Sequence, residues 1–257
     1  MKILIVIPTY TQLDISRQCI LTAQLTLPET AEVLVVDDCS PDWSDQFFLG
    51  LPFQDRLHVQ RRLTPTRSMT SAWNDGMAFA RKGRFDCVVL ANSDLIFSHG
   101  WWEATQRALE KIPDRMTGPM TNAPGSRPEQ DIRRLLPDYT ANDSLFAVTD
   151  IQRKIEQLPT RNRIEDGAVN GFCITAMTDA WFAGAYSSKY VFNPKYPLAG
   201  NEDEWQKRVE KQGRQSGRVM GSFVFHYRGL SRGLVGSTRG YYRKETDEKV
   251  EDSSCSR

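Results

Sequence analysis

The segment Cys87–Phe97, with the sequence CVVLANSDLIF, constrains the fold more than any other part of the chain. Residues 88–91 form an apolar run rich in β-branched side chains, which predicts a strand buried on both faces. The run stops at Asn92, Ser93 and Asp94. Ligands of open α/β sheets bind outside the carboxyl ends of such strands, so Asp94 is placed to handle a metal or a phosphate. The same three residue types also favour a simple hydrogen-bonded turn.

Strands and helices alternate through the first half of the chain. Apolar runs predict strands at 3–7, 33–36 and 57–60, and helical spacing predicts helices at 13–27, 69–80 and 101–111. Thr11 with Asp14 is typical of a capping box, and Ser40 before Pro41 is typical of another helix start. This alternation predicts an α/β fold with a mostly parallel, Rossmann-like central sheet, flanked by helices and joined by right-handed crossovers.

The second half is less regular. Residues 117–137 are rich in proline, glycine and arginine, which predicts a long, partly mobile loop. A helix is expected at 143–158 and a strand at 169–177. A further helix opens at residue 201 and ends at Gly213, and a last strand covers 222–226. Beyond Gly229 the composition predicts a surface arm.

Composition limits the classes of protein to which the chain can belong. With 257 residues, 40% hydrophobic and 25% charged, it suits one large domain. A formal net charge of +1 gives no bulk attraction to nucleic acid or to an anionic membrane. Five scattered cysteines without a CxxC pair indicate reduced thiols, and no apolar stretch approaches the ~20 residues of a membrane span. We therefore expect a cytoplasmic protein, with any attachment to the inner membrane face peripheral.

Polar side chains stand at the predicted ends of four apolar strands. The carboxyl ends of parallel strands share one edge of a sheet, so these side chains should meet in a single cleft. The residues are Thr9, Tyr10, Asp37, Asp38, Asp94 and His226.

The chain resembles the family 2 glycosyltransferases, which are inverting enzymes with a GT-A-type nucleotide-sugar fold. The resemblance rests on the order and spacing of several short motifs. They are IPTY at 7–10, VVDDCS at 35–40, NDG at 74–76, LANSD at 90–94, GPMTNAP at 118–124, VNGFC at 169–173, NED at 201–203 and HYRGLSR at 226–232. It implies one domain over 1–232, with a nucleotide-sugar-binding half at 1–117, an irregular acceptor-binding half at 118–232, and a tail at 233–257.

The resemblance assigns donor-binding roles to the first half. It implies that Thr9, Tyr10 and Asp38 hold the nucleotide base, and a carboxylate can accept hydrogen bonds from the imide N–H of uracil and from ribose hydroxyls. A UDP-linked donor is therefore expected, although thymine carries the same imide. The full expected donor set is Pro8, Thr9, Tyr10, Asp37, Asp38, Arg67, Asn74, Asn92 and Ser93.

A metal site is implied at Asp94, which matches the last aspartate of the family's DxD motif, with His226 as a second ligand. Mn²⁺ or Mg²⁺ suits oxygen ligands and is usually held by one or two protein groups together with substrate phosphates. The chain departs from the family at the first two positions of this motif, which are Asn92 and Ser93, and near the start of the 69–80 helix, where Ser68 replaces a glycine and Trp73 an arginine.

The resemblance makes Asp203 the catalytic base. An inverting transfer needs a base to take the proton from the attacking acceptor hydroxyl. Acidic residues are also common in first helical turns for reasons of the helix dipole, which would keep Asp203 ionised. The expected acceptor-binding residues are Asn170, Gly171, Phe172 and Glu202. Three tryptophans are either sugar-stacking platforms or core residues, namely Trp101, Trp102 and Trp181.

The sequence lacks the short motifs of several other enzyme classes. It has no GxxxxGK, no GxSxG, and no glycine-rich loop after the first strand. The expected acceptor is a surface glycan, a glycolipid or a protein. One alternative is a viral enzyme that glycosylates a hydroxylated DNA base, which needs basic loops. The other is a non-catalytic nucleotide-sugar or glycan-binding module. The arginines behind the DNA alternative are Arg127, Arg133, Arg134, Arg161, Arg163, Arg228, Arg232, Arg239 and Arg243.

Overall fold

The computed structural model describes residues 1–228, so the predicted tail at 233–257 lies outside the described residues. The elements alternate as expected in the first half. In chain order they are β1 (Ile3–Thr9), α1 (Leu13–Thr26), β2 (Ala31–Asp37), η1 (Asp45–Phe48), η2 (Gln54–Arg56), β3 (Leu57–Arg61), α2 (Met69–Gly83), β4 (Cys87–Ala91), β5 (Leu95–Phe97), α3 (Trp101–Lys111), β6 (Thr117–Met120), η3 (Pro128–Gln130), η4 (Ile132–Arg134), α4 (Leu145–Glu156), η5 (Pro159–Asn162), β7 (Ile164–Asp166), β8 (Cys173–Met177), α5 (Thr178–Ala183), α6 (Asn201–Glu210) and β9 (Gly217–His226).

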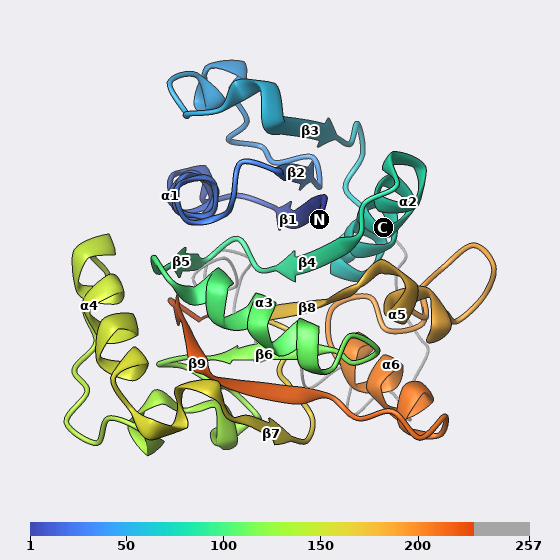
Figure 1. Ribbon diagram of the computed structural model, residues 1–257. Coiled ribbons are helices and arrows are strands. Elements are labelled where there is room, and N and C mark those ends of the chain that lie inside the picture. The colour runs from blue at the N-terminus through green and yellow to red at the C-terminus, as the bar shows by residue number, and fades with distance from the viewer. Residues whose placement is uncertain (229–257) are drawn as a thin grey trace, which may run out of the picture.

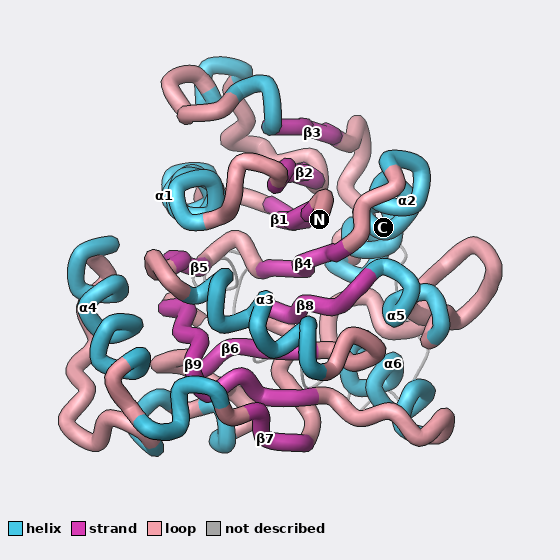
Figure 2. Tube along the Cα trace, in the orientation of Figure 1, coloured by secondary structure: helices cyan, strands magenta, loops and turns pink. Residues whose placement is uncertain are grey.

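Nine strands of the described chain form one curled central sheet. Its order is β3-β2-β1-β4-β8-β6-β9-β5, with β7 added on β9. Figure 2 shows the strands stacked from β3 at one edge to β7 at the other. β1, β2, β3 and β4 run parallel to one another. β8 is antiparallel to both of its neighbours, β4 and β6, and β9 pairs with β6 in parallel. The predicted α/β fold with a mostly parallel sheet is confirmed.

Helices cover both faces of the sheet because alternate residues of each buried strand point to opposite sides. In β1, Ile3, Ile5 and Ile7 pack with α1 and α3, whereas Leu4 and Val6 pack with α2, α5 and α6. Figure 1 shows α2, α5 and α6 on the right-hand side of the sheet and α1 and α4 on the left. The continuous apolar runs of β1, β2 and β4 are therefore explained by helices that cover both faces of these strands.

One predicted helix cap and one predicted helix start are wrong, although α1 begins at Leu13 as expected. α1 begins after Gln12, which lies in the left-handed region at φ 51° and offers no side-chain cap, so the expected Thr11–Asp14 capping box is not formed. No helix starts at Pro41, and the next helical turn is η1, capped by Ser44. Ser40 is used differently, because its hydroxyl donates to Asp37 and accepts a 3.0 Å bond from the Thr11 N–H. These polar residues fix loops at the sheet edge instead of capping helices.

The predicted loop at 117–137 is wrong at its start. Thr117–Met120 is strand β6, which lies between β8 and β9 inside the sheet. Glycine and proline in TGPM concealed the strand, since proline is rare inside sheets. Pro119 is tolerated because the pairing of β6 with β9 shifts register between Pro119 and Met120.

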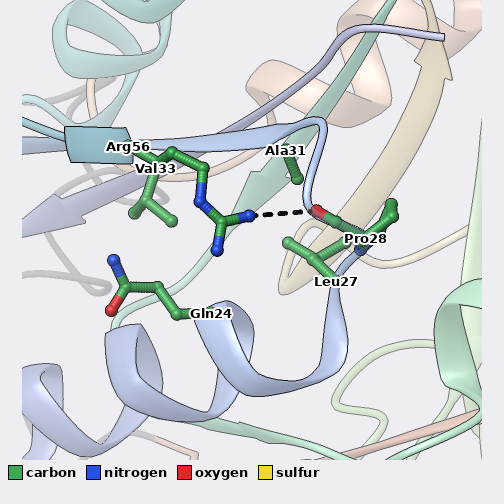
Figure 3. Close-up of a pocket in the computed structure, with 6 residues that line it drawn as sticks. All are labelled: Gln24, Leu27, Pro28, Ala31, Val33 and Arg56. Atoms are coloured by element: carbon green, nitrogen blue, oxygen red, sulfur yellow. Dashed lines mark hydrogen bonds between the residues drawn. The ribbon is translucent and has the colours of Figure 1, made fainter. Parts of the chain in front are cut away.

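A small hollow lies near the amino-terminal end of β2, between the end of α1 and η2. Figure 3 shows Arg56 spanning it to donate a 3.4 Å hydrogen bond to the Pro28 carbonyl. Leu27, Ala31 and Val33 line its apolar side. It lies at the end of the strands opposite to Asp37 and Asp94. Of the helices within residues 1–228, none combines the length and apolar character that crossing a bilayer requires.

Candidate functional site

The carboxyl ends of four strands meet at one edge of the sheet, as the sequence predicts. Thr9 at the end of β1 pairs with Asp37 at the end of β2. Ala91, the last residue of β4, pairs with Cys173, which places the acceptor candidates before β8 beside Asn92. The antiparallel pairing of Leu95 with His226 brings the end of β9 next to Asp94.

Asp94 and His226 form a buried pair. The His226 Nε2 lies 3.3 Å from the Asp94 Oδ1, and their side chains are only 8% and 6% exposed. The other ring nitrogen, Nδ1, lies 3.2 Å from the Ala123 carbonyl oxygen. A carbonyl can only accept, so Nδ1 carries a proton, and Nε2 is the ring nitrogen that faces Asp94. The ring stacks on Phe172 with centroids 5.1 Å apart, which fixes its plane.

This pair fits a divalent metal ion. A ligating histidine typically donates its other ring N–H to a carbonyl, which is the arrangement that Ala123 provides. Within residues 1–228, His, Cys, Asp and Glu side chains nowhere gather in a group of three or more that could hold a metal. An ion between Asp94 and His226 would therefore take its remaining ligands from water and from a bound phosphate, which is the usual arrangement for Mg²⁺.

Asn92 and Ser93 directly precede Asp94 in the chain. The Asn92 N–H donates to the Phe172 carbonyl at 2.8 Å, which fixes the loop against residues 170–172, here called the acceptor segment because the sequence predicts that they bind the acceptor. The Asn92 Oδ1 is buried and, within the described residues, accepts no hydrogen bond. The Thr11 Oγ1 on the neighbouring loop is also buried and has no hydrogen-bond partner within the described residues. Buried polar atoms are normally paired, so unpaired ones at a sheet edge indicate groups that a ligand completes.

Asp38 is held by the loop that follows β3. Its Oδ1 accepts bonds from the Arg62 Nη1 at 2.9 Å, the Thr66 N–H at 2.9 Å and the Thr66 hydroxyl at 2.8 Å, and its Oδ2 accepts from the Arg67 N–H at 2.6 Å. Burial works to raise the pKa of Asp38, but the hydrogen bonds from Arg62, Thr66 and Arg67 outweigh it and hold that pKa below its ordinary value. The residue is therefore an anion at neutral pH.

Asp37 occupies the interior of the same turn. Its carboxylate is fully enclosed and accepts from the Ser40 N–H at 3.0 Å, the Ser40 hydroxyl and the Thr9 hydroxyl at 3.3 Å. This geometry shapes the loop on which Asp38 sits. Pro8, near the end of β1, and Tyr10, directly after it, are half-buried.

The structure separates Arg67 and Asn74, which the sequence assigns together to the donor. Arg67 is exposed, with φ 53°, and its backbone N–H is tied to Asp38. Asn74 is buried in α2, where its Nδ2 donates to the Phe192 carbonyl at 3.0 Å and its Oδ1 accepts from the Phe192 N–H at 2.9 Å. These bonds give Asn74 a structural role, because they anchor the loop that leads to α6.

The acidic first turn of α6 faces the segment before β8. Gln206 anchors this helix through reciprocal bonds of 2.8 and 3.0 Å to the Val169 backbone. A Cβ on Gly171 would lie 2.8 Å from the Glu202 carboxyl carbon, so only glycine leaves this carboxyl its space. Burial raises the pKa of Glu202, and nearby Asp203 adds to the rise against hydrogen bonds from the backbone and the charge of Arg127. The Glu202 Oε2 is buried and accepts no bond within the described residues.

Asp203 stands beside Glu202, with its side chain 38% exposed. Arg127 from the loop after β6 reaches it, with 2.5 Å between the Arg127 Nη2 and the Asp203 Oδ1. A half-exposed carboxylate at a helix start, fixed by a guanidinium, is suited to accept a proton from a bound hydroxyl.

The tryptophans considered as sugar platforms are core residues. Trp101, Trp102 and Trp181 are at most 2% exposed and pack against the sheet. Four of the arginines behind the DNA alternative are occupied by acidic side chains at the surface. Their pairs are Arg127–Asp203, Arg133–Asp131, Arg134–Glu165 and Arg163–Glu165.

Sequence reasoning missed three residues that build this edge. Arg62 closes the loop over Asp38, Asn122 brackets His226, and Arg127 holds Asp203. Arg62 could have been noticed as a charged residue directly after a strand. Asn122 lies inside the motif GPMTNAP at 118–124, on which the family resemblance partly rests. Arg127 is named in the sequence analysis only for the DNA alternative, because no local signal indicates that it pairs with Asp203.

Solved structures share this fold. GalNAc-T7 with UDP, GalNAc and Mn²⁺ aligns with a TM-score of 0.61 at 14% identity, over 88% of this chain and 44% of that one. Residues 1–349 of TarS from S. aureus align in complex with UDP with a TM-score of 0.56 at 14% identity, over 88% of this chain and 60% of that one. A further TarS structure gives a TM-score of 0.57 at 14% identity, over 90% and 62%. The chain therefore spans about half to three-fifths of the length of these proteins.

Sequence comparison gives a more specific result. No curated protein sequence matches the chain. The model of a protein family described as "Glycosyl transferase family 2" matches residues 4–179, which run from β1 into α5 and include Asp38, Asp94 and the acceptor segment before β8. The chain belongs to glycosyl transferase family 2.

Proposed function

We propose that this protein is an inverting glycosyltransferase that moves a sugar from a UDP-linked donor to an acceptor hydroxyl. The single observation that carries the proposal is the buried Asp94–His226 pair at the carboxyl edge of the sheet, with the His226 tautomer set by Ala123. UDP in two of the structural neighbours, and Mn²⁺ beside UDP in one, support a donor and a divalent metal of these kinds.

The donor base is assigned to Asp38. Its Oδ1 already accepts three hydrogen bonds, but its Oδ2 accepts only one from Arg67, so that oxygen retains a lone pair for the imide N–H of uracil. The unpaired Oδ1 of Asn92 suits a ribose hydroxyl. Thymine would satisfy the same oxygen of Asp38, so dTDP-linked donors are the second choice.

The acceptor oxygen attacks the anomeric carbon of the donor sugar while the bond from that carbon to the diphosphate oxygen breaks. The acceptor proton passes to the Asp203 carboxylate, and the diphosphate leaves with the bonding electron pair. General-base assistance of this kind contributes about 10²- to 10⁴-fold. A divalent ion held by Asp94 and His226 would supply electrostatic stabilisation of the departing diphosphate.

The acceptor is proposed to be a glycan, a glycolipid or a protein. We assign acceptor binding to Glu202, whose buried Oε2 is unpaired within the described residues, together with Asn170, Gly171 and Phe172. Four arginines that a DNA-modifying enzyme would direct at phosphates are instead paired with carboxylates, which disfavours a DNA acceptor.

The test is Asp203→Asn, with release of nucleoside diphosphate measured from UDP-, dTDP- and GDP-sugars in the presence of Mn²⁺ and a panel of saccharide acceptors. We expect transfer to fall by at least about 10²-fold, while thermal stabilisation of the protein by the same nucleotide is retained. Unchanged turnover would overturn the base assignment. Nucleotide binding without turnover by the wild-type protein would favour the non-catalytic binding module.

A further inference from the structure

One surface segment connects the parts of the candidate site. Residues 121–131, here called the bridging segment, run from the end of β6 to η4. Thr121 and Gln130 are fully enclosed, and the Thr121 N–H donates to the Gln130 carbonyl at 2.9 Å. The Ile132 N–H donates back to the Thr121 carbonyl at 2.9 Å. The bridging segment is therefore a loop closed at its base and pinned in the core.

Its first residues hold His226. The Asn122 Oδ1 accepts from the His226 backbone N–H at 2.8 Å, and the Asn122 Nδ2 donates to the His226 carbonyl at 3.0 Å. Ala123 accepts the proton of the His226 ring. One side of the bridging segment therefore fixes both the backbone and the tautomer of the candidate metal ligand.

Its remaining residues hold the acceptor segment. The Asn170 side chain donates to the Pro124 carbonyl at 3.1 Å, and the Asn170 backbone N–H donates to the Gln130 Oε1 at 2.6 Å. The Gln130 Nε2 donates to the Pro119 carbonyl at 2.8 Å, which ties this contact to β6. The position of Asn170 therefore depends on the bridging segment at two points.

Arg127 extends from the bridging segment to Asp203, and a salt bridge of 2.5 Å joins the two. On the helix that carries Asp203, the Glu202 Oε2 is buried and Glu204 is paired with Arg208 at 2.8 Å. The Arg127 Nε is buried and, within the described residues, has no acceptor. The planar guanidinium of an arginine presents its N–H donors in fixed directions, so Arg127 can orient the Asp203 carboxylate as well as neutralise its charge.

We propose that Arg127 is a positioning residue of this active site, which holds the carboxylate of Asp203 towards the acceptor while the same bridging segment holds His226. The inference rests on the proposed function. It makes the metal ligand, the acceptor segment and the base parts of one continuous structure, in which Arg127 is the only link to Asp203 from the described part of the bridging segment.

The test uses Arg127→Gln, which removes the charge, and Arg127→Lys, which keeps it. A misplacement of about 1 Å in an active site can cost about 10²-fold in rate, so R127Q should lower kcat for sugar transfer by up to about 10²-fold with little change in the KM of the UDP-sugar. R127K keeps the charge and should restore part of kcat.

The matched control is Arg115→Gln. Arg115 pairs with Asp166 at 2.7 Å and its side chain is 30% exposed, like that of Arg127, but it lies at the amino-terminal ends of β6 and β9. R115Q should keep the wild-type kcat. If R127Q also keeps the wild-type kcat, the positioning role is refuted and the proposed function stands. If wild-type protein transfers sugar from none of the UDP-, dTDP- or GDP-linked donors, both proposals fail.

Discussion

Asp38→Asn measures how much the hydrogen bonds to Asp38 stabilise the loop after β3, which shapes the proposed base pocket. The asparagine oxygen can keep the three bonds that Oδ1 accepts, but the amide nitrogen would face the Arg67 N–H, two donors without an acceptor. The Arg62 guanidinium, 11% exposed, also loses one of its two anionic partners and keeps the other, Asp75. A hydrogen bond to a charged group contributes about 1.5–3 kcal/mol and an unpaired buried donor costs about 1–3 kcal/mol, so we expect the free energy of unfolding to fall by roughly 2–4 kcal/mol.

The assay is urea unfolding as a function of pH, with Asp75→Asn as the control on the same guanidinium. Asp75 is 38% exposed, so its pair with Arg62 should contribute about 0–1 kcal/mol. The pKa of Asp38 is lowered in the folded protein, so its contribution is complete above the unfolded value of about 3.9 and disappears as pH falls through the folded value. The difference between wild type and D38N should therefore be greatest near neutral pH and shrink in acid. Equal stabilities of D38N and D75N near neutral pH would refute this reasoning.

Two further substitutions separate function from stability. Gly171→Val places a side chain 2.8 Å from the Glu202 carboxyl carbon, so we expect a raised acceptor KM with nucleotide binding retained, and an unchanged acceptor KM would remove Glu202 from the acceptor site. Asn74→Leu breaks both bonds to the Phe192 backbone and should lower the free energy of unfolding by roughly 2–5 kcal/mol in a denaturant titration. A leucine variant of wild-type stability would contradict the structural role given to Asn74.

The sheet edge could be predicted because its signals are local. Apolar runs that end in Thr9, Asp38, Asp94 and His226 mark buried strands, and the topology of parallel sheets gathers their ends. The same logic fails for β6, whose sequence TGPM has no apolar run and is a strand only because two neighbours pair with it.

Long-range contacts were beyond sequence reasoning. Arg127 and Asp203 are separated by 76 residues, and nothing in the proline-rich stretch around Arg127 indicates that it closes on α6. Asn74 matches a donor motif, yet both ends of its amide are hydrogen-bonded to the backbone of Phe192, 118 residues away. Motif position identifies the side of the fold on which a residue lies, but hydrogen-bond partners decide which side chains remain available to a ligand.

The central claim is that Asp94 and His226 bind a metal together with a nucleoside diphosphate. The most direct test is thermal unfolding of the wild-type protein, D94N and H226A with UDP, dTDP or GDP, each in Mn²⁺ and in EDTA. We predict that UDP raises Tm of the wild type only with Mn²⁺ present, and that each substitution removes this rise. A rise with UDP that persists in EDTA, or in both variants, would contradict the account, as would the absence of any rise with all three nucleotides.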